Sequence, residues 1–170
     1  MFSERWFMFK KVFLLLLLIL SFSVYAEQSA ALDSEHIGEF YLGQSAKDVQ
    51  KKLRCHLKKQ EDQLWEADGQ YHQTWDCYEG GISFDMVSNE KGGAKTVGSI
   101  MVSVPNAGKT KRGIHIGSTE QEVERLYAKE KDAEASRPHQ NFIAGSIYGG
   151  LSFQFKNGVV ESMFLGAGAE

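Results

Sequence analysis

A ten-position pattern occurs twice in this chain, at residues 40–49 and 114–123, and this repetition is the feature that most constrains the fold. It reads apolar-x-apolar-Gly-x-Ser/Thr-x-x-acidic-Val in both places. The glycine permits a turn, and Ser45 and Thr119 are the expected N-caps of two helices. An acidic residue follows each cap three positions later, as in a capping box. Each copy therefore predicts a short strand that turns into a helix.

Each predicted helix has a single apolar stripe and an otherwise charged surface, so each is expected to lie on a sheet. The stripes consist of Val49, Leu53 and Leu57 in the first helix and of Val123, Leu126 and Tyr127 in the second. Strands with alternating apolar residues also repeat, since residues 80–86 match 149–155 and residues 97–102 match 160–165. Between the last two strands, Asn157-Gly158 indicates a hairpin.

These elements predict an α+β fold of two tandem repeats, each a helix plus an antiparallel β-meander, with the helices packed on one face of the sheet. The first repeat is expected at residues 27–104 and the second at residues 113–170. Residues 105–112, which contain proline, glycine and three basic side chains, are the expected linker between them.

Residues 1–26 have the features of a cleavable signal peptide. Basic residues, among them Lys10 and Lys11, precede an unbroken apolar run at residues 12–20, and a pattern of small residues ends at Ala26. A membrane span needs about 20 apolar residues, so this run is too short, although an uncleaved anchor is the alternative. Cleavage after Ala26 predicts a periplasmic or secreted protein without a stable membrane anchor.

The chain has two cysteines, Cys55 and Cys77. In an oxidising compartment such a pair normally forms a disulfide, and closing a loop of about 23 residues stabilises a fold by about 3 kcal/mol in the chain-entropy model. A redox or metal role is the alternative, but it requires closer spacing or further ligands, and His56 and His72 lack metal-site spacing. The sequence thus predicts a structural disulfide, with no metal and no cofactor.

The paired Leu/Ile-Gly-x-Ser/Thr-x-x-x-Val helices and Gly-Gly-Ile/Leu-Ser-Phe strands resemble the β-lactamase-inhibitory-protein family, and each half resembles the small outer-membrane assembly lipoproteins of the SmpA/OmlA type. The resemblance covers residues 36–168 and implies an exported protein-binding module that uses its sheet face to hold partners. Two departures are evident. There is no lipobox cysteine, and Lys129 and Ser146 stand in the second repeat where the first has its cysteines.

The disulfide also predicts which way the strands face. If Cys77 points toward the helix, alternation turns the intervening side chains of its strand to the opposite, open face. The candidate partner-binding residues on that face are His72, Asp76, Tyr78, Asp85, Met101, Gln154 and Phe164. Aromatic residues and methionine are enriched in interface cores, whereas scattered apolar residues on a surface need no function. Trp65 has no assigned role, and burial in the core is the favoured interpretation.

No catalytic signature occurs in the sequence. It contains neither a Gly-x-Ser-x-Gly elbow nor a His-Glu-x-x-His motif. Asp76 and Asp85 are a conceivable carboxylate pair, but solvated surface acids are the more common case. A net charge of −3 lacks the basic surplus of nucleic-acid-binding proteins. The sequence therefore predicts a protein that is not an enzyme and binds no nucleic acid.

The predicted function is that of an exported module that binds another protein, either an envelope or exported hydrolase or an outer-membrane protein. An inhibitor or immunity protein for a hydrolase is the favoured role, because it needs only a rigid complementary face. The alternative is a cell-envelope or outer-membrane assembly accessory protein. A third class is a small-ligand or enzymatic role in the groove between the repeats, which would require a deep apolar pocket.

Overall fold

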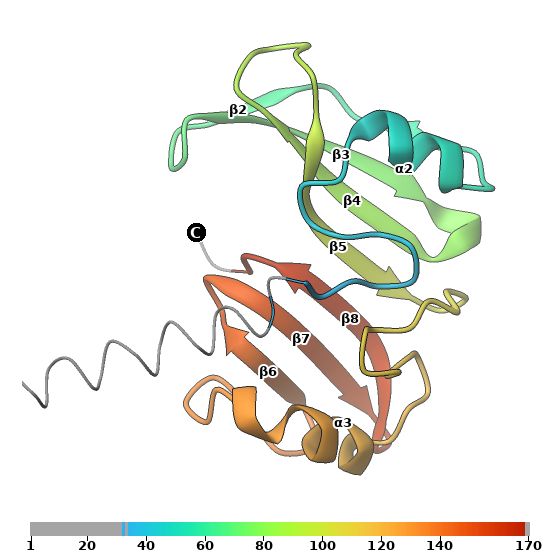
Figure 1. The fold of residues 1–170 in the computed structure, drawn as a ribbon, viewed down its shortest axis with the longest axis vertical. Coiled ribbons are helices and arrows are strands. Elements are labelled where there is room, and N and C mark those ends of the chain that lie inside the picture. The colour runs from blue at the N-terminus through green and yellow to red at the C-terminus, as the bar shows by residue number, and fades with distance from the viewer. Residues whose placement is uncertain (1–31, 33, 169–170) are drawn as a thin grey trace, which may run out of the picture. The chain divides into compact units, whose positions relative to one another are not determined.

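The computed structural model describes residues 32 and 34–168, which consist mostly of one antiparallel sheet (Figure 1). Its strand order is β1-β3-β4-β5-β8-β7-β6, and β2 pairs with β3 beside β1. The strands are β1 (Lys58–Lys59), β2 (Gln63–Trp65), β3 (Gln70–Cys77), β4 (Ile82–Ser88), β5 (Thr96–Ser103), β6 (Asn141–Ser146), β7 (Gly149–Lys156) and β8 (Val159–Gly166). The helices are α2 (Ala46–Lys52), α3 (Glu120–Tyr127) and two 3₁₀ turns, η1 (Tyr78–Gly80) and η2 (Ala128–Glu130).

The prediction of an α+β fold built from two tandem helix-plus-meander repeats is wrong. In the described residues, eight strands form a single sheet, and the two α-helices have only seven and eight residues. The first helix ends early because Leu53 adopts an extended backbone, with φ −68° and ψ 137°, so Leu57 lies beyond the helix whose stripe it was expected to complete. The strand expected at residues 40–42 is a turn, joined to Ile37 only by an isolated bridge at Phe40.

Both helices begin at the predicted caps. The hydroxyl oxygen of Ser45 accepts a hydrogen bond from the backbone N–H of Asp48, and that of Thr119 accepts one from Glu122. At Thr119 the box is reciprocal, because its own backbone N–H donates to Oε2 of Glu122 over 2.8 Å. This hydrogen bond and a second one, which the Thr119 hydroxyl donates to the same oxygen over 2.9 Å, hold the pKa of the Glu122 carboxyl below its usual value. The repeated cap pattern therefore predicts the helix starts but not their lengths.

The pairing of β5 with β8 joins the two halves of the sequence into one sheet. Its register places Ile100 opposite Leu165 and Met101 opposite Phe164. The hairpin that leads into β8 forms at the predicted place, with positive φ at Asn157 (55°) and Gly158 (77°). Positive φ at both central residues is the conformation that a two-residue hairpin turn requires.

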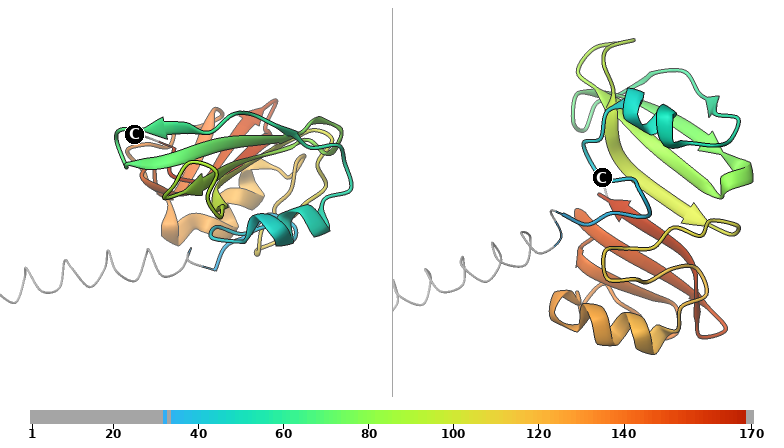
Figure 2. Two further views of the ribbon diagram at one scale, coloured as in Figure 1. Left: turned by 90° about the horizontal axis from the view of Figure 1, so that it is seen from above. Right: turned by 45° about the vertical axis from the view of Figure 1, so that its right-hand side comes forward.

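The core lies on the side of the sheet that faces both helices, which lie to the same side in Figure 2 (left). Val49 of α2 and Val123 of α3 are fully buried there. Tyr127, at the end of α3, packs its ring 5.3 Å from that of Phe153 on β7. Neither helix lies over the opposite face of the sheet.

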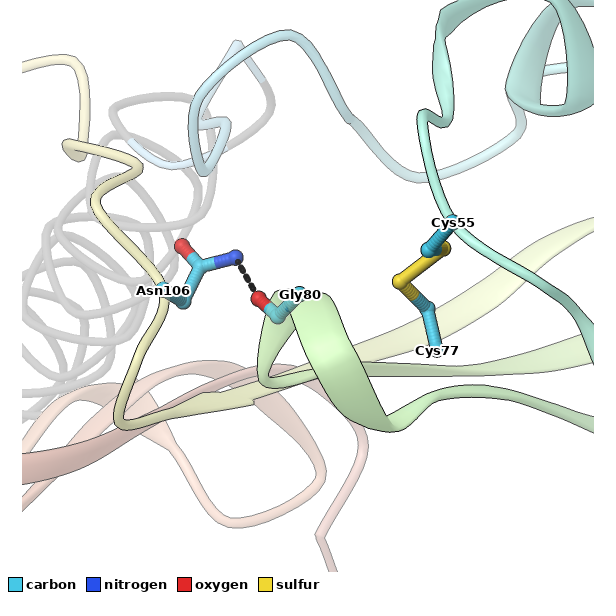
Figure 3. The surroundings of a disulfide bond; sticks show 4 residues. All are labelled: Cys55, Cys77, Gly80 and Asn106. Carbon is cyan, nitrogen blue, oxygen red and sulfur yellow. Dashed lines mark hydrogen bonds between the residues drawn. A yellow bond between two sulfur atoms is a disulfide. The ribbon is translucent and has the colours of Figure 1, made fainter.

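The predicted disulfide is confirmed, since Cys55 is bonded to Cys77 with their Cα atoms 5.9 Å apart (Figure 3). It ties the chain that follows α2 to the end of β3 and so fixes which face of β3 turns toward the helix. Nearby, the amide of Asn106 donates to the carbonyl of Gly80 over 2.9 Å, which anchors the segment after β5 to the same corner.

A buried polar cluster connects the beginning of the described chain with α3. The hydroxyl of Tyr127 donates to Oε2 of Glu35 over 3.0 Å and lies 2.9 Å from Oγ1 of Thr110. Burial raises the pKa of Tyr127 far above its usual value. Arg112 lies with its guanidinium carbon 4.5 Å from the centre of the Tyr127 ring and donates to both carboxylate oxygens of Glu130. Residues 105–112, the predicted linker, thus contribute buried contacts between β5 and α3.

We expect Tyr127→Phe to lower the free energy of unfolding by about 1–3 kcal/mol, because Glu35 loses a buried donor. Urea denaturation measures this difference. Tyr148→Phe is the matched control, since Tyr148 is 74% exposed and its substitution should leave the midpoint unchanged. Equal midpoints for Tyr127→Phe and the native protein would contradict the stabilising role of the cluster.

We expect the double substitution Cys55→Ser and Cys77→Ser to lower the free energy of unfolding by about 3 kcal/mol, the value for a closed loop of this length. Reduction of the native protein should give the same loss, whereas the reductant should not affect the double variant. An oxidised protein no more stable to urea than the reduced one would contradict this expectation.

Candidate functional site

The face of the sheet opposite the helices carries a hollow of about 950 Å³. Small residues of the central strands form part of its lining, among them Ser99 on β5, Ser152 on β7 and Ser162 on β8. Larger side chains surround them, namely those of Trp65, Asp68, His72, Asp85, Met101, Gln154 and Phe164. Because these strands span both halves of the sequence, the hollow exists only where β5 and β8 are paired.

Five of the seven predicted partner-binding residues line the hollow, namely His72, Asp85, Met101, Gln154 and Phe164. The strand register confirms the predicted alternation, since Phe84, Ile100 and Leu165, their neighbours along the strands, are buried on the other face. The structure therefore brings together residues far apart in the sequence. That these residues bind a partner stays a prediction.

Asp76 and Tyr78 lie outside the hollow. Asp76 shares the open face, where it pairs in register with Ser83, but it is only 9% exposed. Its carboxylate accepts hydrogen bonds from the hydroxyl of Ser83 over 2.7 Å and from that of Tyr78 over 3.2 Å. Asp76 is thus occupied by its neighbours, and Tyr78, which begins η1, is 67% exposed beside it.

His72 is held between two carboxylates at one end of the hollow. Its Nδ1 lies 2.7 Å from Oδ2 of Asp85, and its Nε2 lies 2.9 Å from Oδ2 of Asp68. The ring of Trp65 stacks on the imidazole, with centroids 3.6 Å apart and planes inclined by 9°. These contacts fix β2, the turn after it and β4 around one side chain, so this wall of the hollow is preorganised.

The two carboxylates are in different environments. Burial raises the pKa of Asp85, although the hydrogen bond from His72 opposes that rise. The pKa of Asp68 is lowered, first by a hydrogen bond from the backbone N–H of Gln70 and then by His72. Asp68 therefore ionises more readily than Asp85, and an additional hydrogen-bond donor would stabilise the ionised form of Asp85 more than that of Asp68.

Among the residues that line the hollow, the one histidine, His72, is not free to act as a base. Both ring nitrogens of His72 are engaged by carboxylate oxygens, so neither is free to take a proton from a hydroxyl such as that of Ser99. What the hollow offers is a set of hydrogen-bond acceptors beside apolar surface. That chemistry suits recognition of donor groups.

A β-bulge shapes the floor of the hollow. The pairing of β4 with β5 shifts between Asp85 and Met86, which leaves Gly98 as an extra residue on β5. A Cβ at Gly98 would lie 2.7 Å from Cγ1 of Val87 and 3.2 Å from Oδ2 of Asp85. A side chain at this position would clash with Val87 and crowd Asp85, so the position requires glycine.

Sequence reasoning missed Trp65 and Asp68. Trp65 is not a core residue, because it lies at the hollow on the ring of His72. The signal that was available is the dipeptide Asp68-Gly69, which favours a hairpin turn. In the structure the hairpin that contains this dipeptide pairs Trp65 with Gln70 and brings Trp65 next to the strand that carries His72.

Cys55, Cys77 and Glu79 have potential ligand atoms within 4.8 Å of one another. Both sulfurs are bonded to each other, so neither is the thiolate that a metal requires. The group is therefore the surroundings of a disulfide.

No protein-family model, curated protein or solved structure matches this chain. The resemblance to inhibitory and assembly proteins therefore stays a prediction. The predicted signal peptide, residues 1–26, lies outside the described residues. Among the helices that the structure describes, none has the length and apolar character to cross a membrane.

We expect His72→Ala to lower the free energy of unfolding by about 1–3 kcal/mol, because the half-buried Asp85 loses its donor. His115→Ala is the control, because His115 is exposed and its ring has one hydrogen-bond partner among the described residues, the hydroxyl of Ser118. This substitution should change the free energy of unfolding by no more than about 0.5 kcal/mol. Thermal or urea unfolding measures both. Equal effects would show that His72 does not hold this wall.

Proposed function

We propose that this protein is an exported binding protein that holds part of another protein in the hollow on the open face of its sheet. The observation that carries the proposal is the hollow itself, about 950 Å³ on the face that neither helix covers. The proposal of export rests separately on the signal-peptide pattern of residues 1–26, which lie outside the described residues.

The hollow is large and continues along the sheet, which suits a protein partner. Sites for small molecules measure roughly 300–1,000 Å³ and bury most of their ligand, so this hollow is at the upper limit of that range. It adjoins a second hollow of about 180 Å³, which shares Gln154 and Phe164 and extends to Ile147. A surface that continues in this way suits a protruding loop with several side chains.

The exposure of its apolar residues also supports an interface. Met101 is 45% exposed and Ile147 is 39% exposed, although both are large apolar side chains. Methionine and aromatic residues are enriched in the cores of interfaces, and acidic residues among them provide specificity. The hollow combines Met101 and Phe164 with Asp85 in this manner.

The finer role that we propose is inhibition of, or immunity to, a hydrolase of the bacterial envelope. An inhibitor requires a rigid complementary surface and no catalytic groups of its own. Paired strands, the disulfide and the His72 contacts supply that rigidity. A disulfide is also typical of proteins in oxidising compartments.

We expect Met101→Ala to weaken capture of the partner at least tenfold while leaving the melting temperature nearly unchanged, because the side chain is half-exposed in the hollow. Leu42→Ala is the matched control: Leu42 is 41% exposed but lies in the turn before α2, outside the hollow. The experiment is a pull-down from envelope extract with the full-length gene product purified in its oxidised form, followed by affinity measurement with the recovered protein.

A soluble hydrolase that binds one-to-one, is inhibited, and binds Met101→Ala more weakly than Leu42→Ala would support the proposal. Recovery of outer-membrane proteins would replace the inhibitor role with that of an envelope-assembly accessory. Equal capture by both variants would show that the partner does not bind in the hollow.

A further inference from the structure

We infer that the hollow receives a basic side chain of the partner, with a guanidinium group bound by the carboxylate of Asp85. This inference rests on the proposed function and specifies the chemistry of the contact.

The charges in the hollow favour a cation. Its ionisable lining residues are Asp68, Asp85 and His72, and no lysine or arginine is among the residues that line it. His72 lies between the two carboxylates and offsets at most one of their charges. The serine hydroxyls and the amide oxygen of Gln154 add neutral acceptors. A partner group that brings hydrogen-bond donors and positive charge therefore matches this surface, and a carboxylate does not.

Asp85 is the carboxylate with capacity for such a donor. Its side chain is 21% exposed, and its Oδ2 is taken by His72 at 2.7 Å. No described residue donates a hydrogen bond to its Oδ1. Burial raises the pKa of Asp85, so the ionised form lacks stabilisation that an approaching cation would supply. Asp68, by contrast, already accepts from Gln70 and His72 on its two oxygens.

The apolar lining suits the stem of an arginine. Met101 and Phe164 are neighbours across the β5–β8 pairing, and Ser99, which lies opposite Asp85, is two residues from Met101 along β5. Long basic side chains bury their methylene groups on apolar surface while the charged end reaches a carboxylate. A guanidinium is planar, carries several N–H donors and is more weakly hydrated than an ammonium, so it is the better fit to a half-buried carboxylate with one oxygen available.

The test uses NMR of the full-length gene product labelled at its methionine methyl groups. The probes are two glycine–serine heptapeptides that differ only at the central residue, which is arginine in one and the uncharged citrulline in the other. Met101 lies in the hollow, whereas Met86 and Met163 are fully buried in the core and serve as internal controls. We expect the arginine peptide to shift the Met101 methyl signal and to leave those of Met86 and Met163 in place.

We expect Asp85→Asn to weaken binding of the arginine peptide at least tenfold, and the citrulline peptide to bind the native protein at least tenfold more weakly. If Asp85→Asn does not fold, the native protein supplies a second test, since binding of the arginine peptide should weaken as ionic strength rises. Equal binding of the two peptides, or no shift of Met101 up to millimolar arginine peptide, would overturn the inference. Capture of a partner that Met101→Ala weakens would leave the proposed function intact in that case.

Discussion

The pairing of β5 with β8 is the contact on which the remaining structure depends. Four residue pairs form it, and they alternate between the two faces of the sheet. Ile100 and Leu165 enter the core on the helix side, where both are buried. Met101 and Phe164 face the hollow. A shift of one residue would exchange these sets, so burial of the core also determines which side chains the open face presents.

The two faces of the sheet serve different purposes. On the helix side, the disulfide and the cluster around Tyr127 fix the connections that follow α2 and precede α3. These contacts hold the chain without occupying the open face. That face can therefore carry residues that contribute little to stability, such as the half-exposed Met101. A fixed core beneath an accessible surface supports the proposed function, because a preorganised face loses less conformational freedom on binding.

Local chemistry was predictable from the sequence, and long-range pairing was not. The caps at Ser45 and Thr119, the Asn157-Gly158 turn and the facing of the strands follow from neighbouring residues, and the structure confirms them. The fold class was wrong because β5 pairs with β8 and joins both halves of the chain into one sheet, and because the backbone becomes extended at Leu53 although apolar spacing continues past Lys52. Apolar periodicity and capping residues do not show where a helix ends when tertiary contacts of the following residues override helix propensity.

The same distinction applies to the site. Alternation along strands identified the residues of the hollow that lie on long strands, such as Asp85 and Phe164. It could not find Trp65 or Asp68, because their positions depend on a short hairpin and on hydrogen bonds to His72. It also could not separate Asp76, which shares the face, from the residues that line the hollow, because that difference arises from its bonds to Ser83 and Tyr78.

One continuous sheet brings residues of both halves of the chain into a single hollow. The most direct measurement is a nuclear Overhauser experiment between the β5 and β8 backbones and between the side chains of Met101 and Phe164. We expect cross-strand contacts at Ile100–Leu165 and Val102–Met163, together with contacts between the Met101 methyl and the Phe164 ring. Their absence in the folded, oxidised protein would separate the two halves and remove the hollow on which the proposed function depends.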